Sequence, residues 1–180
     1  MIITNDAPLA RRLRALRNHG VDPDSSTIDF IIAGYNYRLT EFQGAMGVVQ
    51  MKKLERIVGK RVEAARRYDA ALEDTEITAP RAQKGACHVY QSYVTLLPER
   101  AAEKRAEMIT VAKKRGVELQ VGTIHMPLTT FYRNRYGFRP GDFPVTDSVD
   151  ARALTLPLHE KLTHSEQETV LETVFDLLEH

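Results

Sequence analysis

The 180-residue sequence has a single cysteine, almost no net charge and no long apolar run. One cysteine, Cys87, excludes an intrachain disulfide framework and favours a reducing compartment. The histidines are scattered, and none pairs with Cys87 at the spacing of metal ligands, so we expect no metal site. No apolar run reaches membrane-spanning length, and the N-terminus lacks the hydrophobic region of a secretory signal. These absences predict a cytoplasmic protein with no membrane partner.

The balance of charge bears on the possible partners. Lys and Arg number 25 against 24 Asp and Glu, which gives no reason to expect nucleic acid as a partner. The basic run "ARRLRALR" (10–17) would suit a phosphate-binding patch. However, the leucines at 9, 13 and 16 have helical spacing, which favours a solvated helix face. A DNA-binding regulator built on this run is therefore a third-rank hypothesis.

The first part of the chain is predicted to be mostly helical. Residues 1–4 form a short apolar strand candidate, and Asn5-Asp6 can cap a helix that ends at Gly20. Thr40-x-x-Gln43 has the form of a capping box and opens a long helical stretch. A break in that stretch is expected near Lys52 or Gly59.

The second part alternates between helices and strands, which predicts an α+β unit from about residue 80. Ser165-x-x-Glu168 fits a second capping box, at the start of the terminal helix. The other predicted elements are strands over 88–97 and 117–124 and helices over 101–115 and 145–154. The predicted organisation is 1–39, 40–79 and 80–177, with the closing "LEH" (178–180) interpreted as the start of a vector-encoded tag.

The stretch "GYNYRLTEFQGAMG" (34–47) places a glycine, an asparagine and an arginine among aromatics ahead of a helix. Simple packing at a loop-to-helix junction is one explanation. The other is display of Asn36 and Arg38 to an anion, because an amide donates to phosphate and free N–H groups at a helix start favour negative charge. From the residues alone, the simpler explanation is favoured, namely that Asn36 is a turn residue beside Gly34.

Five segments in order resemble the DegT/DnrJ/EryC1/StrS family of pyridoxal 5′-phosphate (PLP)-dependent sugar aminotransferases. The resemblance implies the C-terminal part of a type I, aspartate aminotransferase-like fold, with the edge of the large domain, connecting helices and a small α+β domain. It also implies transfer of an amino group from glutamate or glutamine to a keto-sugar, usually nucleotide-linked, by a homodimer that makes antibiotic or polysaccharide sugars. The segments are "MIITND…LARRLRALRNHG", "GYNYRLTEFQGAMGVVQMKKLERI", "RRYDAAL", "HVYQSYV" and "TLPLHEKLT".

The resemblance also implies site residues. Asn36 matches the asparagine that reaches the cofactor phosphate of the other subunit, and Arg38 is a second candidate beside it. His125 and Tyr132 lie where relatives carry histidine and tyrosine near the sugar nucleotide, although a satisfied loop histidine explains His125 as well. Arg17, Asn18 and His19 (17–19) are candidates to border the partner's site, and helix termination at Gly20 explains the same residues.

No catalytic residue is expected in this chain. In the family the Schiff-base lysine lies shortly before the segment that resembles "MIITND", and none of the eight lysines here matches it. We therefore expect the C-terminal portion of a parent enzyme, inactive alone and truncated either naturally or for expression. The alternative is a non-catalytic assembly or interaction protein that shares the fold and pairs through exposed helices.

Overall fold

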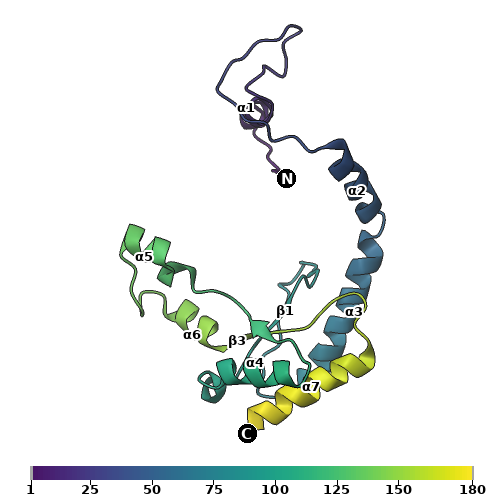
Figure 1. Ribbon diagram of the computed structural model, residues 1–180, viewed down its shortest axis with the longest axis vertical. Helices are drawn as coiled ribbons and strands as arrows, with labels where there is room; N and C mark the ends of the chain where they lie inside the picture. The colour runs from purple at the N-terminus through teal and green to yellow at the C-terminus, as the bar shows by residue number, and fades with distance from the viewer. Residues whose placement is uncertain (1, 180) are drawn as a thin grey trace. The chain divides into compact units, whose positions relative to one another are not determined.

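The structure, a computed structural model, describes residues 2–179 and divides into two compact units between Lys53 and Leu54 (Figure 1). This division differs from the predicted boundaries at 39/40 and 79/80, and the domain assignment itself stays a prediction. The first unit contains α1 (Ala7–Arg17) and α2 (Glu41–Met51).

Over residues 54–179, the second unit contains five longer helices, two short 3₁₀ turns and three strands. In chain order they are α3 (Leu54–Leu72), β1 (Tyr93–Leu96), η1 (Glu99–Ala101), α4 (Arg105–Lys114), β2 (Gln120–Val121), η2 (Met126–Leu128), α5 (Thr130–Tyr136), α6 (Pro144–Arg152), β3 (Ala153–Leu156) and α7 (His164–Glu179).

Side-chain caps fix the helix starts of the first unit. The Asp6 carboxylate accepts the Leu9 N–H at 2.9 Å. Thr40 Oγ1 accepts the Gln43 N–H at 3.2 Å while Gln43 Oε1 accepts the Thr40 N–H at 3.0 Å, which confirms the predicted capping box.

Two other predictions for the first part have different outcomes. The helical stretch breaks after Met51, as expected, and Gly59 lies inside α3. The strand predicted over 1–4 is wrong for residues 2–4, because no described strand pairs with them; Met1 lies outside the described residues.

The second unit is built on a three-stranded antiparallel sheet of order β1-β3-β2. Tyr93 lies opposite Leu156, and Gln120 lies opposite Thr155. Directly after β2, a side chain at Gly122 would place its Cβ 2.5 Å from Val94 Cγ1. The close approach of this segment to the sheet therefore requires glycine.

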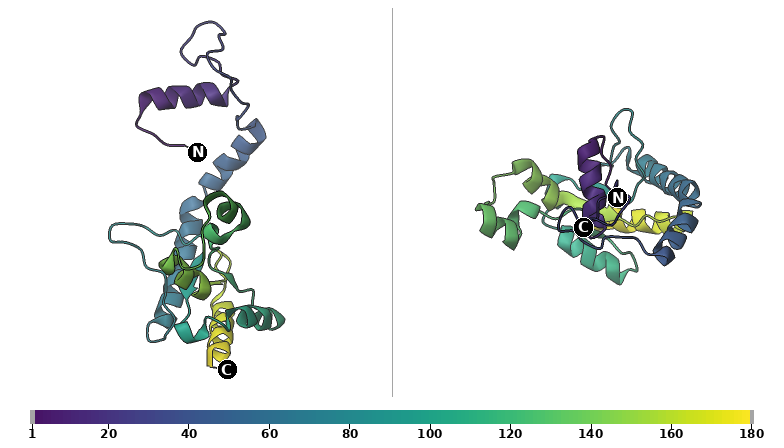
Figure 2. Two further views of the ribbon diagram at one scale, coloured as in Figure 1. Left: turned by 90° about the vertical axis from the view of Figure 1, so that its left-hand side faces the viewer. Right: turned by 90° about the horizontal axis from the view of Figure 1, so that it is seen from above.

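Helices α3, α4 and α7 enclose the core of this unit, with α7 packed against both α3 and α4 (Figures 1 and 2). Gln167 on α7 is 2% exposed and joins the helices, because its Nε2 donates to Ala64 O at 3.0 Å and its Oε1 accepts from Arg67 Nε at 2.5 Å. The larger buried apolar side chains include Tyr68, Leu72, Tyr93, Leu97, Met108, Leu154, Leu156, Val174 and Leu178.

Two buried tyrosines supply polar links inside that core. Tyr68 donates its hydroxyl to Pro157 O at 3.0 Å, and Tyr93 donates to Asp69 Oδ1 at 2.6 Å. Burial raises the pKa of Tyr68 to about 12. Burial, followed by the hydrogen bond to the Asp69 carboxylate, also raises the pKa of Tyr93. Both hydroxyls therefore stay protonated as donors at neutral pH.

Several predicted boundaries in this unit need correction. The strand expected over 88–97 is confined to β1, and Tyr90 has a φ of 48° just ahead of it, which is incompatible with extended backbone. The strand over 117–124 is likewise only the two residues of β2. The helix expected from Ala101 begins at Arg105, since residues 99–101 form a 3₁₀ turn.

The start of the terminal helix also differs from the prediction. The capping box consists of Thr163 and Glu166, two residues earlier than predicted: Thr163 Oγ1 accepts the Glu166 N–H at 3.2 Å, and the Glu166 carboxylate accepts the Thr163 N–H at 2.8 Å. At the other end, Leu178 is buried in the core. The interpretation of residues 178–180 as part of a tag stays a prediction, and His180 lies outside the described residues.

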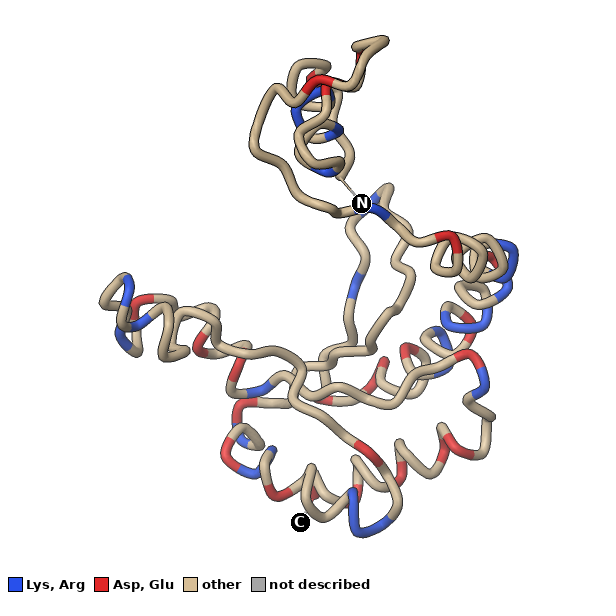
Figure 3. The backbone as a smooth tube through the Cα atoms, turned by 45° about the horizontal axis from the view of Figure 1, so that its top comes forward, with Lys and Arg blue, Asp and Glu red and all other residues tan. Residues whose placement is uncertain are grey.

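Charge is distributed unevenly among the helices, as Figure 3 shows. Helix α1 carries four arginines and no acidic residue, whereas α7 carries five acidic residues and no Lys or Arg. None of the helices in the described residues is both long enough and apolar enough to cross a membrane.

Candidate functional site

The first unit holds Asn36 and Arg38 on a segment that returns alongside the end of α1. The last carbonyls of a helix lack partners within the helix. Here Tyr35 N–H donates to Leu16 O at 2.7 Å, and Tyr37 N–H donates to Arg17 O at 2.9 Å. The segment 35–37 thus closes the end of α1, and this pairing fixes the backbone on both sides of Asn36.

Two glycines make the return possible. Gly20 has a φ of 85°, which a side chain would strain, and its backbone touches that of Gly34. A Cβ on Gly34 would lie 2.1 Å from Gly20 N, closer than any real contact. Gly34 is therefore needed for close approach of two backbones, which accounts for the glycine that opens "GYNYRLT".

The residues of this segment alternate between two faces. Tyr35 and Tyr37 stack with ring centroids 4.9 Å apart and planes 6° from parallel. Side chains two apart in extended backbone share a face, so Asn36 and Arg38 lie opposite the stacked rings. Together with residues 2–4 and α1, the tyrosines border a hollow of about 840 Å³.

Arg38 fixes the orientation of the Asn36 amide. Its Nε donates to Asn36 Oδ1 at 3.0 Å, and its Nη2 lies 3.4 Å from His19 Nε2. A guanidinium can only donate, so the Asn36 oxygen is committed to Arg38 and the Asn36 Nδ2 group remains as a donor. All three side chains are exposed.

This arrangement suits an anion with several oxygens. It offers an oriented amide donor and a guanidinium that is always charged. None of the carboxylates in the described residues forms an ion pair with Arg38 or Arg17, and Asp22 and Asp24 are both bound to Arg11 at 2.6 Å. A phosphate group fits this donor set without displacing an existing acid.

His125 has a different environment in the second unit. Its side chain is 9% exposed, and Nε2 lies 2.6 Å from Asp147 Oδ1. A carboxylate can only accept, so Nε2 carries the hydrogen. Nδ1 is buried and has no hydrogen-bond partner within the described residues. Both ring nitrogens thus face the protein, and direct contact of His125 with a substrate stays an untested prediction.

Tyr132 lies on α5 at the start of an aromatic ladder. Its ring stacks on Tyr136 at 5.9 Å, Tyr136 stacks on Phe138 at 5.5 Å, and Phe138 meets Phe143 edge-on at 5.0 Å. Tyr132 is half-buried, and its hydroxyl makes no hydrogen bond within the part of the chain that the structure describes. The ring is therefore held by stacking, and the hydroxyl is left to interact outside the ladder.

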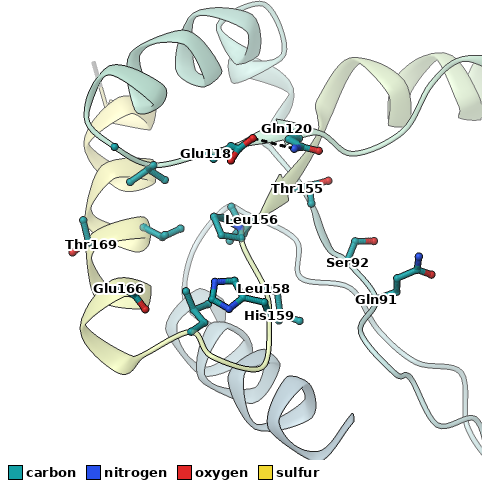
Figure 4. Close-up of a pocket in the computed structure, with 15 residues that line it drawn as sticks. Gln91, Ser92, Glu118, Gln120, Thr155, Leu156, Leu158, His159, Glu166 and Thr169 are labelled. Atoms are coloured by element: carbon teal, nitrogen blue, oxygen red, sulfur yellow. Dashed lines mark hydrogen bonds between the residues drawn. The ribbon is translucent and has the colours of Figure 1, made fainter. Parts of the chain in front are cut away.

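The second unit also contains a hollow of about 550 Å³ at the end of the sheet (Figure 4). Glu118 and Gln120, which are hydrogen-bonded at 3.5 Å, line one side, and His159 and Glu166 line another (Figure 4). None of the four candidate residues borders it. His159 accepts the Lys161 N–H at 3.2 Å, in keeping with a residue of the turn before α7.

Two contacts of the candidate residues could not be derived from the sequence. The partnership of His19 with Arg38 spans 19 residues, and that of Asp147 with His125 spans 22. An acidic residue early in a helix is common and is explained by the helix dipole alone, so Asp147 carried no distinctive signal.

Comparison with known proteins identifies the family. The DegT/DnrJ/EryC1/StrS aminotransferase family matches residues 1–175. The chain belongs to this family. Among curated relatives, GDP-perosamine synthase of Caulobacter vibrioides is 27% identical, with 99% of this chain and 47% of that protein covered. The spore coat polysaccharide biosynthesis protein SpsC of Bacillus subtilis is 28% identical, with coverage of 99% and 49%.

Solved structures agree with this membership. PseC of Helicobacter pylori, an aminotransferase involved in the biosynthesis of pseudoaminic acid, has a TM-score of 0.86 at 24% identity and shows the shared fold over 98% of this chain and 47% of its own. The putative sugar aminotransferase Spr1654 of Streptococcus pneumoniae, in its PMP form, has a TM-score of 0.87 at 25% identity, with 98% and 44% covered.

These comparisons confirm two predictions at the level of family and fold. The chain spans about half the length of the curated relatives it matches, so its mixture of helices with a small sheet is part of a PLP-dependent aminotransferase fold. Spr1654 has been solved in a PLP form as well as a PMP form, which indicates the cofactor of the family.

Proposed function

We propose that this polypeptide is the C-terminal portion of a PLP-dependent aminotransferase that transfers an amino group from glutamate or glutamine to a nucleotide-linked keto-sugar. The observation that carries the proposal is the free Nδ2 donor of Asn36, oriented by Arg38 on an exposed segment that contains no competing acid. Membership of the sugar aminotransferase family supports the same activity.

In this proposal Asn36 donates a hydrogen bond to the cofactor phosphate of the partner subunit in a homodimer. A neutral amide adds a directed contact without a further charge, while Arg38 contributes long-range attraction for the dianion. When bound, PLP supplies the electron sink through which amino groups are exchanged. The role of the first unit is therefore to hold and orient the phosphate end of the cofactor.

The sugar nucleotide would meet the second unit at Tyr132. The stacked ladder fixes the ring, and the hydroxyl has no protein partner among the described residues, so it can donate to a sugar or phosphate oxygen. The identity of the sugar would depend on further groups of the complete pocket.

The 180-residue polypeptide alone is proposed to be inactive. None of its eight lysines matches the position of the cofactor lysine of the family. The eight are Lys52, Lys53, Lys60, Lys84, Lys104, Lys113, Lys114 and Lys161. An assembly role is the second candidate function. It is favoured by α2, in which no residue is buried and the Phe42 side chain is 75% exposed.

A paired assay tests the proposal. The full-length protein that contains this sequence is incubated with PLP, glutamate or glutamine, and a panel of nucleotide-linked keto-sugars, and amino-sugar formation is followed by mass spectrometry. We expect product from the full-length protein and none from the 180-residue polypeptide. No product from any pairing, combined with stable pairing of the polypeptide through α2 in size-exclusion chromatography, would favour the assembly role instead.

A further inference from the structure

The segment from η2 to the start of α6 (126–143) is held at both ends by one carboxylate. Asp147, in the first turn of α6, binds His125 Nε2 through Oδ1 at 2.6 Å and accepts the Gly141 N–H through Oδ2 at 3.0 Å. His125 precedes the segment and Gly141 lies near its end, so one side chain ties together three stretches of backbone.

The segment that Asp147 closes has little other support. It comprises η2, α5 and the turn up to Phe143, and α5 has no buried residue. Within it, the aromatic ladder from Tyr132 to Phe143 gives internal cohesion. In Figure 1, α5 and α6 lie together, away from α3 and α7. The attachment of this segment to the sheet-bearing core therefore depends strongly on the pair of His125 and Asp147.

The geometry of His125 argues against a direct role as a ligand. The Nε2–H group already donates to Asp147 Oδ1, and Nδ1 is buried without a partner in the described residues. A substrate could reach neither nitrogen unless the side chain first left its site. A buried polar atom without a partner is unfavourable, and the hydrogen bond to Asp147 is therefore the favourable polar contact of His125 in this site.

We infer that His125 and Asp147 form a brace that sets the position of segment 126–143, and that His125 serves substrate binding as a positioning residue through this brace. The part that concerns substrate rests on the proposed function. The brace itself is a property of this chain and can be measured without cofactor, substrate or activity.

Hydrogen exchange on the 180-residue polypeptide tests the brace. His125→Phe keeps a ring but removes the donor, and Asp147→Asn leaves one acceptor oxygen for the two donors, His125 Nε2 and Gly141 N–H. Because hydrogen bonds to charged groups are among the stronger ones, we expect amides in 126–143 to exchange about tenfold faster or more in both variants. Amides of β1 and β3 should keep the wild-type rate, which shows that the unit remains folded.

Two further variants make the result specific. His125→Gln offers an N–H donor at a similar distance and should restore exchange to within about threefold of wild type. Asp150→Asn is the matched control, one helical turn later, and its side chain makes no hydrogen bond or ion pair within the described residues. Unchanged exchange in His125→Phe, or equal acceleration in Asp150→Asn, overturns the brace.

The same variants in the full-length enzyme test the link to substrate. A positioning role predicts a raised KM for the sugar nucleotide in His125→Phe, rescue in His125→Gln, and no additional loss in the double variant with Asp147→Asn. A ligand role predicts that glutamine fails to rescue, and this result would overturn the inference. If the enzyme transaminates no sugar, the proposed function fails while the exchange data still decide the brace.

Discussion

The two units of this chain differ in what holds them in shape. Among the described residues, the second unit buries sixteen apolar side chains in one cluster that runs from α3 to α7. In the first unit, Ala15 is the buried apolar residue of α1, and α2 buries none. Order there comes from helix caps and from the pairing of 35–37 with the end of α1, while Ile3, Phe42 and Leu39 are each more than 70% exposed.

The larger packed core belongs to the second unit, whereas the candidate phosphate-binding residue belongs to the first. A unit with a closed core resists local opening, whereas one with few buried contacts opens at a lower free energy. The candidate phosphate-binding group, Asn36, lies on the unit with the smaller core. Its geometry therefore depends on backbone hydrogen bonds and two glycines rather than on packing.

The largest change in the free energy of unfolding is expected for a substitution in the central strand of the sheet. Leu154 is fully buried on β3, so Leu154→Ala should lower the free energy of unfolding by about 2–5 kcal/mol. Val48→Ala on α2 is the control, because Val48 is 58% exposed and a change within about 0.5 kcal/mol is expected. Urea unfolding followed by circular dichroism measures both. Equal losses would contradict the contrast.

A smaller, local effect is expected in the first unit. Gly34→Ala places a Cβ against Gly20 N and should cost about 1–3 kcal/mol, by forcing segment 35–37 away from α1. Gly47→Ala, where nothing lies within 4 Å, should instead stabilise α2 by up to about 1 kcal/mol. Exchange rates of the Tyr35 and Tyr37 amides report the first change. Wild-type rates in Gly34→Ala would show that the backbones are not packed as described.

Because the buried tyrosines lie in the second unit, we expect alkaline pH to lower the stability of that unit. Because the pKa of Tyr68 is raised to about 12, its contribution is complete below the unfolded pKa of about 10 and is lost as pH rises through 12. Absorbance at 295 nm, compared between the wild-type protein and Tyr68→Phe, should show Tyr68 ionising near pH 12. Ionisation of Tyr68 near pH 10 in the folded protein would refute its burial.

The smallest effect tests the corrected helix start. Thr163→Ala removes the N-cap of α7 and should cost about 1 kcal/mol, whereas Ser165→Ala should be nearly neutral. Thermal unfolding of the two variants distinguishes them. A larger loss in Ser165→Ala would restore the capping box expected from the sequence.

Local chemistry made part of this structure predictable. The Thr40–Gln43 box, the Asp6 cap and the break after Met51 each depend on residues a few positions apart, and all three are present. The pairing of strands that are far apart in the sequence could be predicted less well. Strand lengths around Tyr93 and Gln120 are set by their common partner β3, and the sequence does not specify how far that pairing extends.

The candidate site divides in the same way. Asn36 and Arg38 are two residues apart, and their grouping followed from the motif itself. The burial of His125 against Asp147 depends on a fold that brings distant segments together. Sequence patterns therefore located the exposed polar cluster but did not reveal that His125 faces inward.

The affinity of the full-length protein for PLP tests the central claim, that the Asn36 amide holds the cofactor phosphate. Asn36→Ala should weaken binding about tenfold or more, as expected for loss of a hydrogen bond to a charged group. Asn5→Ala, an exposed asparagine in the same unit, should leave the affinity unchanged. Wild-type PLP affinity in Asn36→Ala, measured by equilibrium titration of cofactor absorbance, would contradict the account.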